Sequence, residues 1–293
     1  MIRLSKLHDK SYKWLLLIPL ALLIFSFIYL GVFYSNNGDF MKKDISLTGG
    51  TSVTVYWQTD IIDLENKLVN QLEDLNIREI SDLRTREQKA IIVETTTDSE
   101  TTKEVLESYF GFELVEGENS NFEFTGSILS TSFYKQLLIA ILIAFLFMAI
   151  VIFIIFRNLI PSIAVIISAF ADILMTLVLI NILGIKVSTA GIVAFLMLIG
   201  YSVDTDILLT TRVLKRKEGS LNERIFRSFK TGTTMTLTSL LAMLIAFLVV
   251  KSFSAVLAQI FIVLVIGLAF DLLNTWITNV SILKWYMKSR GKE

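Results

Sequence analysis

The chain has 293 residues, 54% of them hydrophobic, and its 27 basic and 27 acidic side chains give a net charge of zero. Only 18% of the residues are charged, whereas a soluble chain carries about a quarter. This composition excludes a soluble enzyme, a secreted disulfide scaffold and a disordered protein. With no cysteine and a single histidine, His8, the sequence predicts neither a metal site nor a cofactor. Any chemistry must come from carboxylates, hydroxyls or cations.

Apolar runs long enough to cross a bilayer, about 20 residues each, recur along the chain. We expect six spans, at Trp14–Tyr34, Leu137–Phe156, Ile160–Leu183, Val187–Thr210, Thr231–Val250 and Phe253–Leu283. Four basic residues precede the first run, but it is too long for a signal peptide and no small-residue cleavage pattern follows it. The sequence therefore predicts a retained anchor.

Basic residues beside the spans indicate the orientation, since they concentrate on the cytoplasmic side. They occur before the first span, at Arg157, in the 212–230 loop and in the tail, whereas the alternate short loops hold only Lys186 and Lys251. We therefore expect a multi-pass protein of the cytoplasmic membrane with both termini cytoplasmic. Residues 1–34 form the flank and first span, 35–134 an external domain, and 135–293 the other five spans.

The external segment, Ser35–Tyr134, has alternating strand and helix patterns. The expected order is a strand in Ile45–Trp57, a helix at Ile61–Leu75, strands at Ile77–Leu83 and Ala90–Thr96, a helix at Ser99–Phe110, and a last strand at Phe112–Val115 or Asn121–Phe124. This βαββαβ order predicts a ferredoxin-like α+β domain between the first two spans. Residues 35–134 hold 8 basic and 19 acidic side chains, so the zero net charge of the whole chain conceals an acidic external domain.

Residues 218–230, between the fourth and fifth spans, are amphipathic. Leu221, Ile225 and Phe229 share one helical face, and basic residues occupy the others. This pattern predicts a helix lying on the inner membrane surface, where its bases contact membrane lipids.

Four aspartates interrupt the spans: Asp172, Asp204, Asp206 and Asp271. A carboxylate at the centre of a span costs about 3 kcal/mol, so each is a functional hypothesis by default. Polar or small stripes run beside them, at Ser168 and Thr176 in the third span, Thr231, Thr234 and Thr238 in the fifth, and Gly267, Asn274, Thr275 and Thr278 in the sixth. Hydroxyl ladders leading to buried carboxylates suit a proton relay; the alternative is a structural polar lock.

The fourth span holds the densest motif, Gly200, Tyr201 and Ser202 followed by Asp204 and Asp206. Residues two apart lie about 200° apart around a helix, so the two aspartates cannot both face the bundle interior. Asp204 shares a face with Gly200, which permits close helix approach, and we expect Asp204 to point inward. Asp206 is expected nearer the cytoplasmic end. Arg212 is either an electrostatic partner of Asp204 or an anchor at the inner surface.

Two enzymatic classes are excluded by missing motifs. There is no GxxxxGK[ST] phosphate loop, which argues against ATP hydrolysis, and the Gly-x-Gly-Asp element of intramembrane aspartyl proteases is absent. The sequence predicts a protein that is not an enzyme.

Four elements together resemble the SecF family, the smaller subunit of the SecDF accessory complex of the protein-export translocase, in its archaeal form. They are DISLTGGT from Asp44, which contains Gly49 and Gly50; TGSILSTSFYKQ from Thr125; Asp172; and GYSVDTDILLTTRVLKR from Gly200. The family's bacterial fourth-span motif reads Gly-Tyr-Ser-x-Asn-Asp-Thr. Asp204 here occupies the asparagine position and Thr205 the aspartate position, so the carboxylate is shifted by one residue.

The resemblance implies half of a resistance–nodulation–division (RND) type bundle. It also implies pairing with a SecD-like subunit, contact with the Sec translocon channel and an unfolded preprotein, no nucleic-acid partner, and use of the proton gradient. A half-size RND-type transporter of lipid or small molecules, and a non-conducting scaffold for SecD, are the alternatives. Gly49 and Gly50 are read either as a hinge or as a site of close backbone approach.

Overall fold

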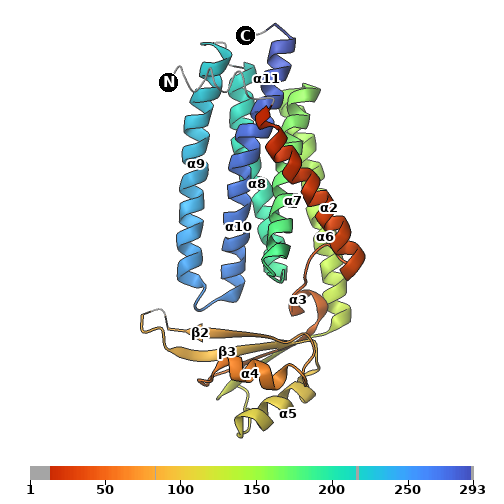
Figure 1. Ribbon diagram of the computed structural model, residues 1–293, viewed down its shortest axis with the longest axis vertical. Coiled ribbons are helices and arrows are strands. Elements are labelled where there is room, and N and C mark those ends of the chain that lie inside the picture. Colours follow the sequence, from red (N-terminus) through yellow and green to blue (C-terminus); the bar gives the residue numbers. More distant parts are fainter. Residues whose placement is uncertain (1–13, 83, 216–217, 292–293) are drawn as a thin grey trace.

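A computed structural model describes residues 14–82, 84–215 and 218–291. In this part of the chain, six helical segments are long and apolar enough to span a membrane, as predicted. They are α2 (Leu17–Asn37), α6 (Ser127–Phe156), α7 (Leu159–Ile182), α8 (Thr189–Lys215), α9 (Leu221–Val250), and α10 (Ala255–Leu273) continued by η1 (Asn274–Asn279) and α11 (Val280–Ser289). The bundle stands over a small β-sheet (Figure 1). His8, the bases before Trp14, Arg216 and Lys217 lie outside the described residues.

The domain between α2 and α6, which we expect to be external, is ferredoxin-like, as predicted. Its elements are α3 (Ile45–Thr48), β1 (Gly50–Val55), α4 (Ile61–Leu68), β2 (Asn76–Ser81), β3 (Gln88–Thr95), α5 (Ser99–Phe110) and β4 (Ser120–Thr125). The sheet has the order β2-β3-β1-β4 and is antiparallel throughout. Alternate strand residues such as Val53 and Val93 pack with Leu64 and Leu106 of the helices. The opposite face of the sheet is turned toward the bundle (Figure 1).

The expected first strand was too long, because residues 45–48 form the short helix α3. Asp44 caps this helix by accepting a 2.8 Å hydrogen bond from the N–H of Ile45. Gly49 ends it with φ of +86°, a conformation that glycine adopts readily. The strand begins only at Gly50, and the last strand is the second of the two expected alternatives.

The Gly49–Gly50 pair permits close backbone approach. A Cβ at Gly49 would lie 2.5 Å from Cα of Ser127, the first residue of α6, and one at Gly50 would overlap the carbonyl oxygen of Thr95. No side chain can be accommodated at either contact. The geometry supports the structural interpretation of this motif rather than a free hinge.

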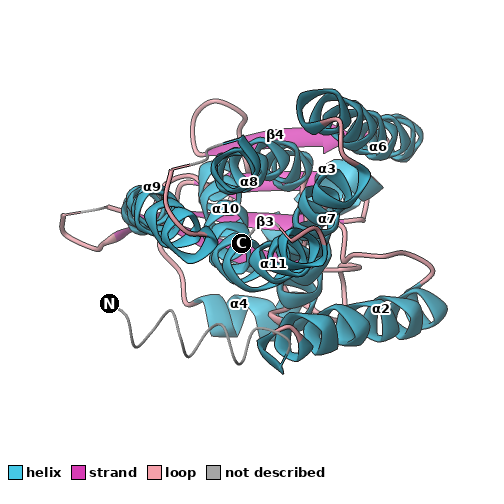
Figure 2. Ribbon diagram, turned by 90° about the horizontal axis from the view of Figure 1, so that it is seen from above, coloured by secondary structure: helices cyan, strands magenta, loops and turns pink. Residues whose placement is uncertain are grey.

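Helices α7, α8 and α10 form the centre of the bundle, with α2, α6 and α9 outside them (Figure 2). Small residues permit the tightest contacts: Gly267 of α10 lies against the side chain of Leu198, and Gly232 of α9 lies against Trp276 and Thr205. Lys284 of α11, which the sequence places among the bases of the tail, is only 1% exposed. Together with η1 and α11, which continue α10, the central helices contain most of the buried polar residues in the described part of the chain.

Residues 218–230 do not form a separate helix lying on the membrane, so that prediction is wrong. Ser220 and Glu223 form a capping box at Leu221, and α9 continues from there to Val250 without interruption. Of the predicted apolar face, Leu221 and Ile225 are buried in a cluster with Leu209 and Val280, whereas Phe229 is 42% exposed and packs edge-to-face against Trp276.

Candidate intramembrane carboxylate site

Three carboxylates from three helices are completely buried at the centre of the bundle. Asp172 of α7, Asp206 of α8 and Asp271 of α10 are each 0% exposed. The three carboxylates lie close together. Both Asp172 and Asp206 are near enough to Asp271 to interact with it electrostatically. In the described residues the groups that surround them are hydroxyls and amides, and no salt bridge reaches them.

Asp172 connects α7 to the other two central helices. Its Oδ2 accepts a 2.5 Å hydrogen bond from the Ser202 hydroxyl of α8, and its Oδ1 accepts one of 2.7 Å from the Asn274 amide. Thr176, one turn along α7, donates to the backbone carbonyl of Asp172. The stripe predicted on the third span, Ser168, Asp172 and Thr176, is buried as expected.

Asp206 and Asp271 share one hydroxyl. The Oγ1 atom of Thr275 lies 2.9 Å from Oδ1 of Asp206 and 3.1 Å from Oδ1 of Asp271. Asp206 also accepts a 2.7 Å hydrogen bond from the Asn279 amide, while its Oδ2 has no hydrogen-bond partner among the described residues. Thr236 of α9 approaches Oδ2 of Asp271 at 3.4 Å. The single hydroxyl proton of Thr275 is therefore shared between Asp206 and Asp271.

The sixth span changes its winding beside the carboxylate site. Residues 274–279 form a π-helix, η1, three residues after Asp271. Within it Asn274, Thr275 and Asn279 are fully buried, each 0% exposed. Asn279 was missed in the sequence, and no local pattern there signals a π-helix.

The expectation that Asp204 faces the bundle interior is wrong. Asp204 is exposed on α8, and Asp206 takes the inward place with Ser202 and Leu209. Gly200 on that face leaves room for close approach, but no helix among the described residues uses it, because a Cβ at Gly200 would meet nothing within 4 Å. Tyr201 is 36% exposed. The inward face is instead marked by Ser202 and Asp206, one turn apart.

Two other expectations about side-chain direction need correction. Arg212 donates to the carbonyl of Arg227 and to Thr231 Oγ1, both at 2.9 Å, so it joins α8 to α9 rather than pairing with Asp204. On α9, Thr234 and Thr238 are exposed and donate to carbonyls of their own helix. Gly232 and Thr236 form the buried face in their place.

This arrangement can hold and exchange protons. An isolated buried carboxylate is costly, and three close together cannot all remain ionised, so at least one of them must carry a proton. Hydroxyls both donate and accept, as a proton path requires. A group of three or more metal-ligating side chains in binding geometry is not found within the described ranges.

The fold and the buried site together define a class, that of membrane proteins with six candidate spans and a ferredoxin-like domain between the first two. The family model that describes the C-terminal part of the protein-export membrane proteins SecD and SecF matches residues 106–289. The chain is 41% identical over 284 residues to the protein-export membrane protein SecF of Methanocaldococcus jannaschii, covering 95% of this chain and 96% of that one. It is 38% identical over 285 residues to SecF of Methanothermobacter thermautotrophicus, covering 96% and 95%. The chain belongs to the SecF family of protein-export membrane proteins.

Solved structures agree on the fold. The crystal structure of SecDF, a translocon-associated membrane protein from Thermus, matches with a TM-score of 0.71 at 19% identity. The match covers 96% of this chain but 38% of the SecDF chain. A second SecDF structure, in a super-membrane-facing form, gives a TM-score of 0.58 at 17% identity. This chain thus corresponds in fold to less than half of a SecDF polypeptide.

Proposed function

We propose that this protein is the SecF subunit of a SecDF-type complex, and that it assists Sec-dependent export by coupling proton movement to the handling of an unfolded preprotein on the outer side. The observation that carries the coupling is the buried group of Asp172, Asp206 and Asp271, joined by hydroxyls across three helices. Protein export itself follows from family membership.

The proton path that we propose runs along alternating carboxyls and hydroxyls. Ser202 bonds Asp172 and is also close enough to Asp271 to interact with it. Thr275 then joins Asp271 to Asp206. A protonated Asp271 can donate its proton to the Thr275 hydroxyl while that hydroxyl gives its own proton to ionised Asp206. The result is the transfer of one proton from Asp271 to Asp206 across two hydrogen bonds. Each charge that crosses the membrane potential supplies about 2.3 kcal/mol per 100 mV.

Pairing with a SecD-like subunit is supported by the exposed Asp204. It lies half a turn along α8 from Ser202, which bonds the buried Asp172, and is therefore at the same depth as the carboxylate site. A carboxylate facing lipid at that depth is costly, and the neighbouring Gly200 leaves room for a closely packed helix. We propose that SecD covers this face. A unique cysteine in Gly200→Cys should crosslink to the SecD-like subunit, whereas one in Leu142→Cys, on exposed α6, should not.

The coupling is tested by export into membrane vesicles made with and without this protein. We expect the protein to speed the release of exported chains, and we expect dissipation of the proton gradient to remove most of that gain. A gain that persists without the gradient would instead support the scaffold alternative. Thiol labelling of single cysteines in residues 35–134 and in the tail tests the proposed orientation, with both termini cytoplasmic.

One observation favours the transporter alternative. An apolar cavity of about 430 Å³ opens between α2 and α7, lined by residues that include Phe27, Leu174 and Phe195. Such a site suits a lipid chain. Normal protein export with altered lipid distribution in cells lacking this protein would favour that function over export.

A further inference from the structure

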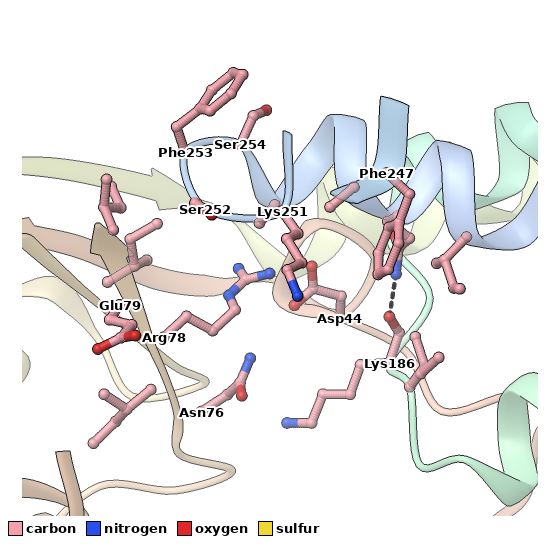
Figure 3. Close-up of a pocket in the computed structure, with 18 of the residues that line it drawn as sticks. Asp44, Asn76, Arg78, Glu79, Lys186, Phe247, Lys251, Ser252, Phe253 and Ser254 are labelled. Carbon is pink, nitrogen blue, oxygen red and sulfur yellow. Dashed lines mark hydrogen bonds between the residues drawn. The ribbon is translucent and has the colours of Figure 1, made fainter. Parts of the chain in front are cut away.

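A cavity of about 670 Å³, lined by both polar and apolar residues, lies between the external sheet and the outer end of the bundle (Figure 3). Strand β2 lines one wall with Asn76 to Ile80, and the opposite wall comes from the α7–α8 turn and the α9–α10 turn. The cavity therefore lies where the external domain meets the membrane helices. Nothing in the proposed proton path uses it.

Strand β2 is an open edge of the sheet. Among the described residues it pairs with β3 on one side only, so alternate backbone N–H and C=O groups on its other side are available to a further strand. Figure 1 shows β2 at the margin of the sheet with no helix in front of it. Its six residues extend over about 20 Å. This edge is long enough to pair with a short extended segment.

One end of this edge already bonds to the backbone of another segment. The N–H of Ser81 donates a 3.0 Å hydrogen bond to the carbonyl of Ser252 in the α9–α10 turn. At the other end, Lys186 of the α7–α8 turn pairs with Asp74 at 2.8 Å. The bundle thus holds both ends of β2 and leaves the cavity open between them.

The side chains around the edge suit a polypeptide of mixed composition. Arg78 and Ile80 lie on the sheet face turned to the bundle, in register with Ile92 and Ala90 of β3. Ile80, Ile92 and Phe247 give apolar surface, while Arg78, Lys251 and Asp44 direct charged groups into the cavity (Figure 3). Strand addition obtains affinity from the backbone, and pockets for alternate side chains add preference. A small apolar ligand would leave the backbone groups of β2 unused.

We propose that the β2 edge and this cavity bind an extended segment of the exported polypeptide by strand addition. The inference rests on the proposed function, because that function makes an unfolded chain the molecule passing this surface. The occupant is a β-strand formed by the preprotein, with its backbone paired to residues 76–80 and its side chains alternating between the cavity and solvent.

The test uses the complete complex in membrane vesicles with a translocating preprotein. Because the chain contains no cysteine, Ile80→Cys gives a unique thiol for a benzophenone photo-crosslinker. Asn121→Cys is the matched control, since Asn121 lies on the same sheet face but on the opposite edge strand, β4. We expect the preprotein to crosslink several times more strongly from position 80. We also expect Ile80→Lys to slow release of the preprotein while Asn121→Lys does not, because a lysine on an edge strand opposes strand addition.

Equal crosslinking from both positions, or crosslinking from position 80 to the SecD-like subunit alone, would overturn the proposal. The proposed function is tested separately by deleting the whole protein. If deletion leaves export unchanged, the proposed function fails. If deletion slows export but position 80 gives no preferential crosslink to the preprotein, only the strand-addition site fails.

Discussion

The Ser202 hydroxyl of α8 donates a 2.5 Å hydrogen bond to Asp172 of α7, and both side chains are almost completely buried. An ionised Asp172 can only accept this bond, whereas a protonated Asp172 can also donate. The direction of the bond can therefore change with the proton. If the carboxylates exchange protons as proposed, the protonation of Asp172 would act on the contact between α7 and α8.

Asp206→Asn should remove proton-dependent export, while Asp204→Asn should retain it. The amide preserves the size of the buried side chain at position 206 but cannot take up or release a proton. Export from vesicles with and without a proton gradient measures the effect, and we expect Asp206→Asn to reduce the rate to about that seen without a gradient. If Asp204→Asn causes the same loss and Asp206→Asn none, the proton path proposed here is wrong.

Thr275→Val should also remove gradient-dependent export, because it deletes the hydroxyl shared by Asp206 and Asp271 and keeps the side-chain shape. It also leaves Oδ1 of Asp271 without a donor and removes one of the two donors to Oδ1 of Asp206, so the protein should lose about 1–3 kcal/mol of unfolding free energy. Thr275→Ser is the matched control, because it restores the hydroxyl and should keep most of the activity. Equal activity of the valine and serine variants would exclude Thr275 from the path.

Gly49→Ala should destabilise the junction of the external domain with α6. Its positive φ and its contact with Ser127 both resist a Cβ, at a cost of about 1–3 kcal/mol. Gly126→Ala tests a nearby glycine with negative φ and nothing within 4 Å of the added Cβ, so it should be tolerated. Thermal unfolding in detergent, followed together with protease resistance of residues 35–134, compares the two. Equal stability of both variants would contradict the close-approach interpretation.

Acidification should loosen the contact between the end of α2 and the start of α6. Burial alone would raise the pKa of Asp39, but hydrogen bonds from Lys43, Tyr134 and the Phe40 N–H outweigh it and hold the pKa below its usual value. The stabilisation is therefore present above the pKa of the unfolded chain and is lost as the pH falls through the lower folded value.

The melting temperature in detergent, measured at pH 7 and near pH 3, checks this acid effect. Asp39→Asn should be less stable than wild type at pH 7, by about 1 kcal/mol or less for a partly exposed ion pair, and the difference should shrink in acid. A difference that stays constant across this range would show that the Asp39 charge contributes nothing.

Much of the architecture follows from local patterns. The six spans need only length and apolarity, and helix α5 has both its signals in the sequence, Asp98 at its start and Gly111 at its end. The ferredoxin-like order follows from strands and amphipathic helices in sequence. The stripes through Asp172 and Asp271 were correctly assigned because each helix has a dominant polar face.

The sequence did not allow the same prediction of which side chains on α8 and α9 face the interior of the bundle. Gly200, on the same face as Asp204, indicates close packing but not whether the neighbour belongs to the same chain, so Asp204 was placed inward and Asp206 was not. On α9, Thr234 and Thr238 bond their own backbone, which satisfies a hydroxyl on a lipid-exposed face as well as in an interior. The sequence of residues 274–279 gave no signal for the π-helix, and Asn279, four residues after Thr275, was left out of the polar stripe.

The connection between the sheet and the membrane has a mechanical consequence. Strand β4 ends at Thr125 and helix α6 begins at Ser127, so Gly126 alone separates them, and Gly49 is wedged against the same point. Helix α6 then runs for 30 residues, about 45 Å, without a break. Because the joint is one residue long and Gly49 packs against Ser127, we expect a movement of the sheet to be passed directly to the first turn of α6. Since α6 is one unbroken helix, such a movement would also shift its other end at Phe156.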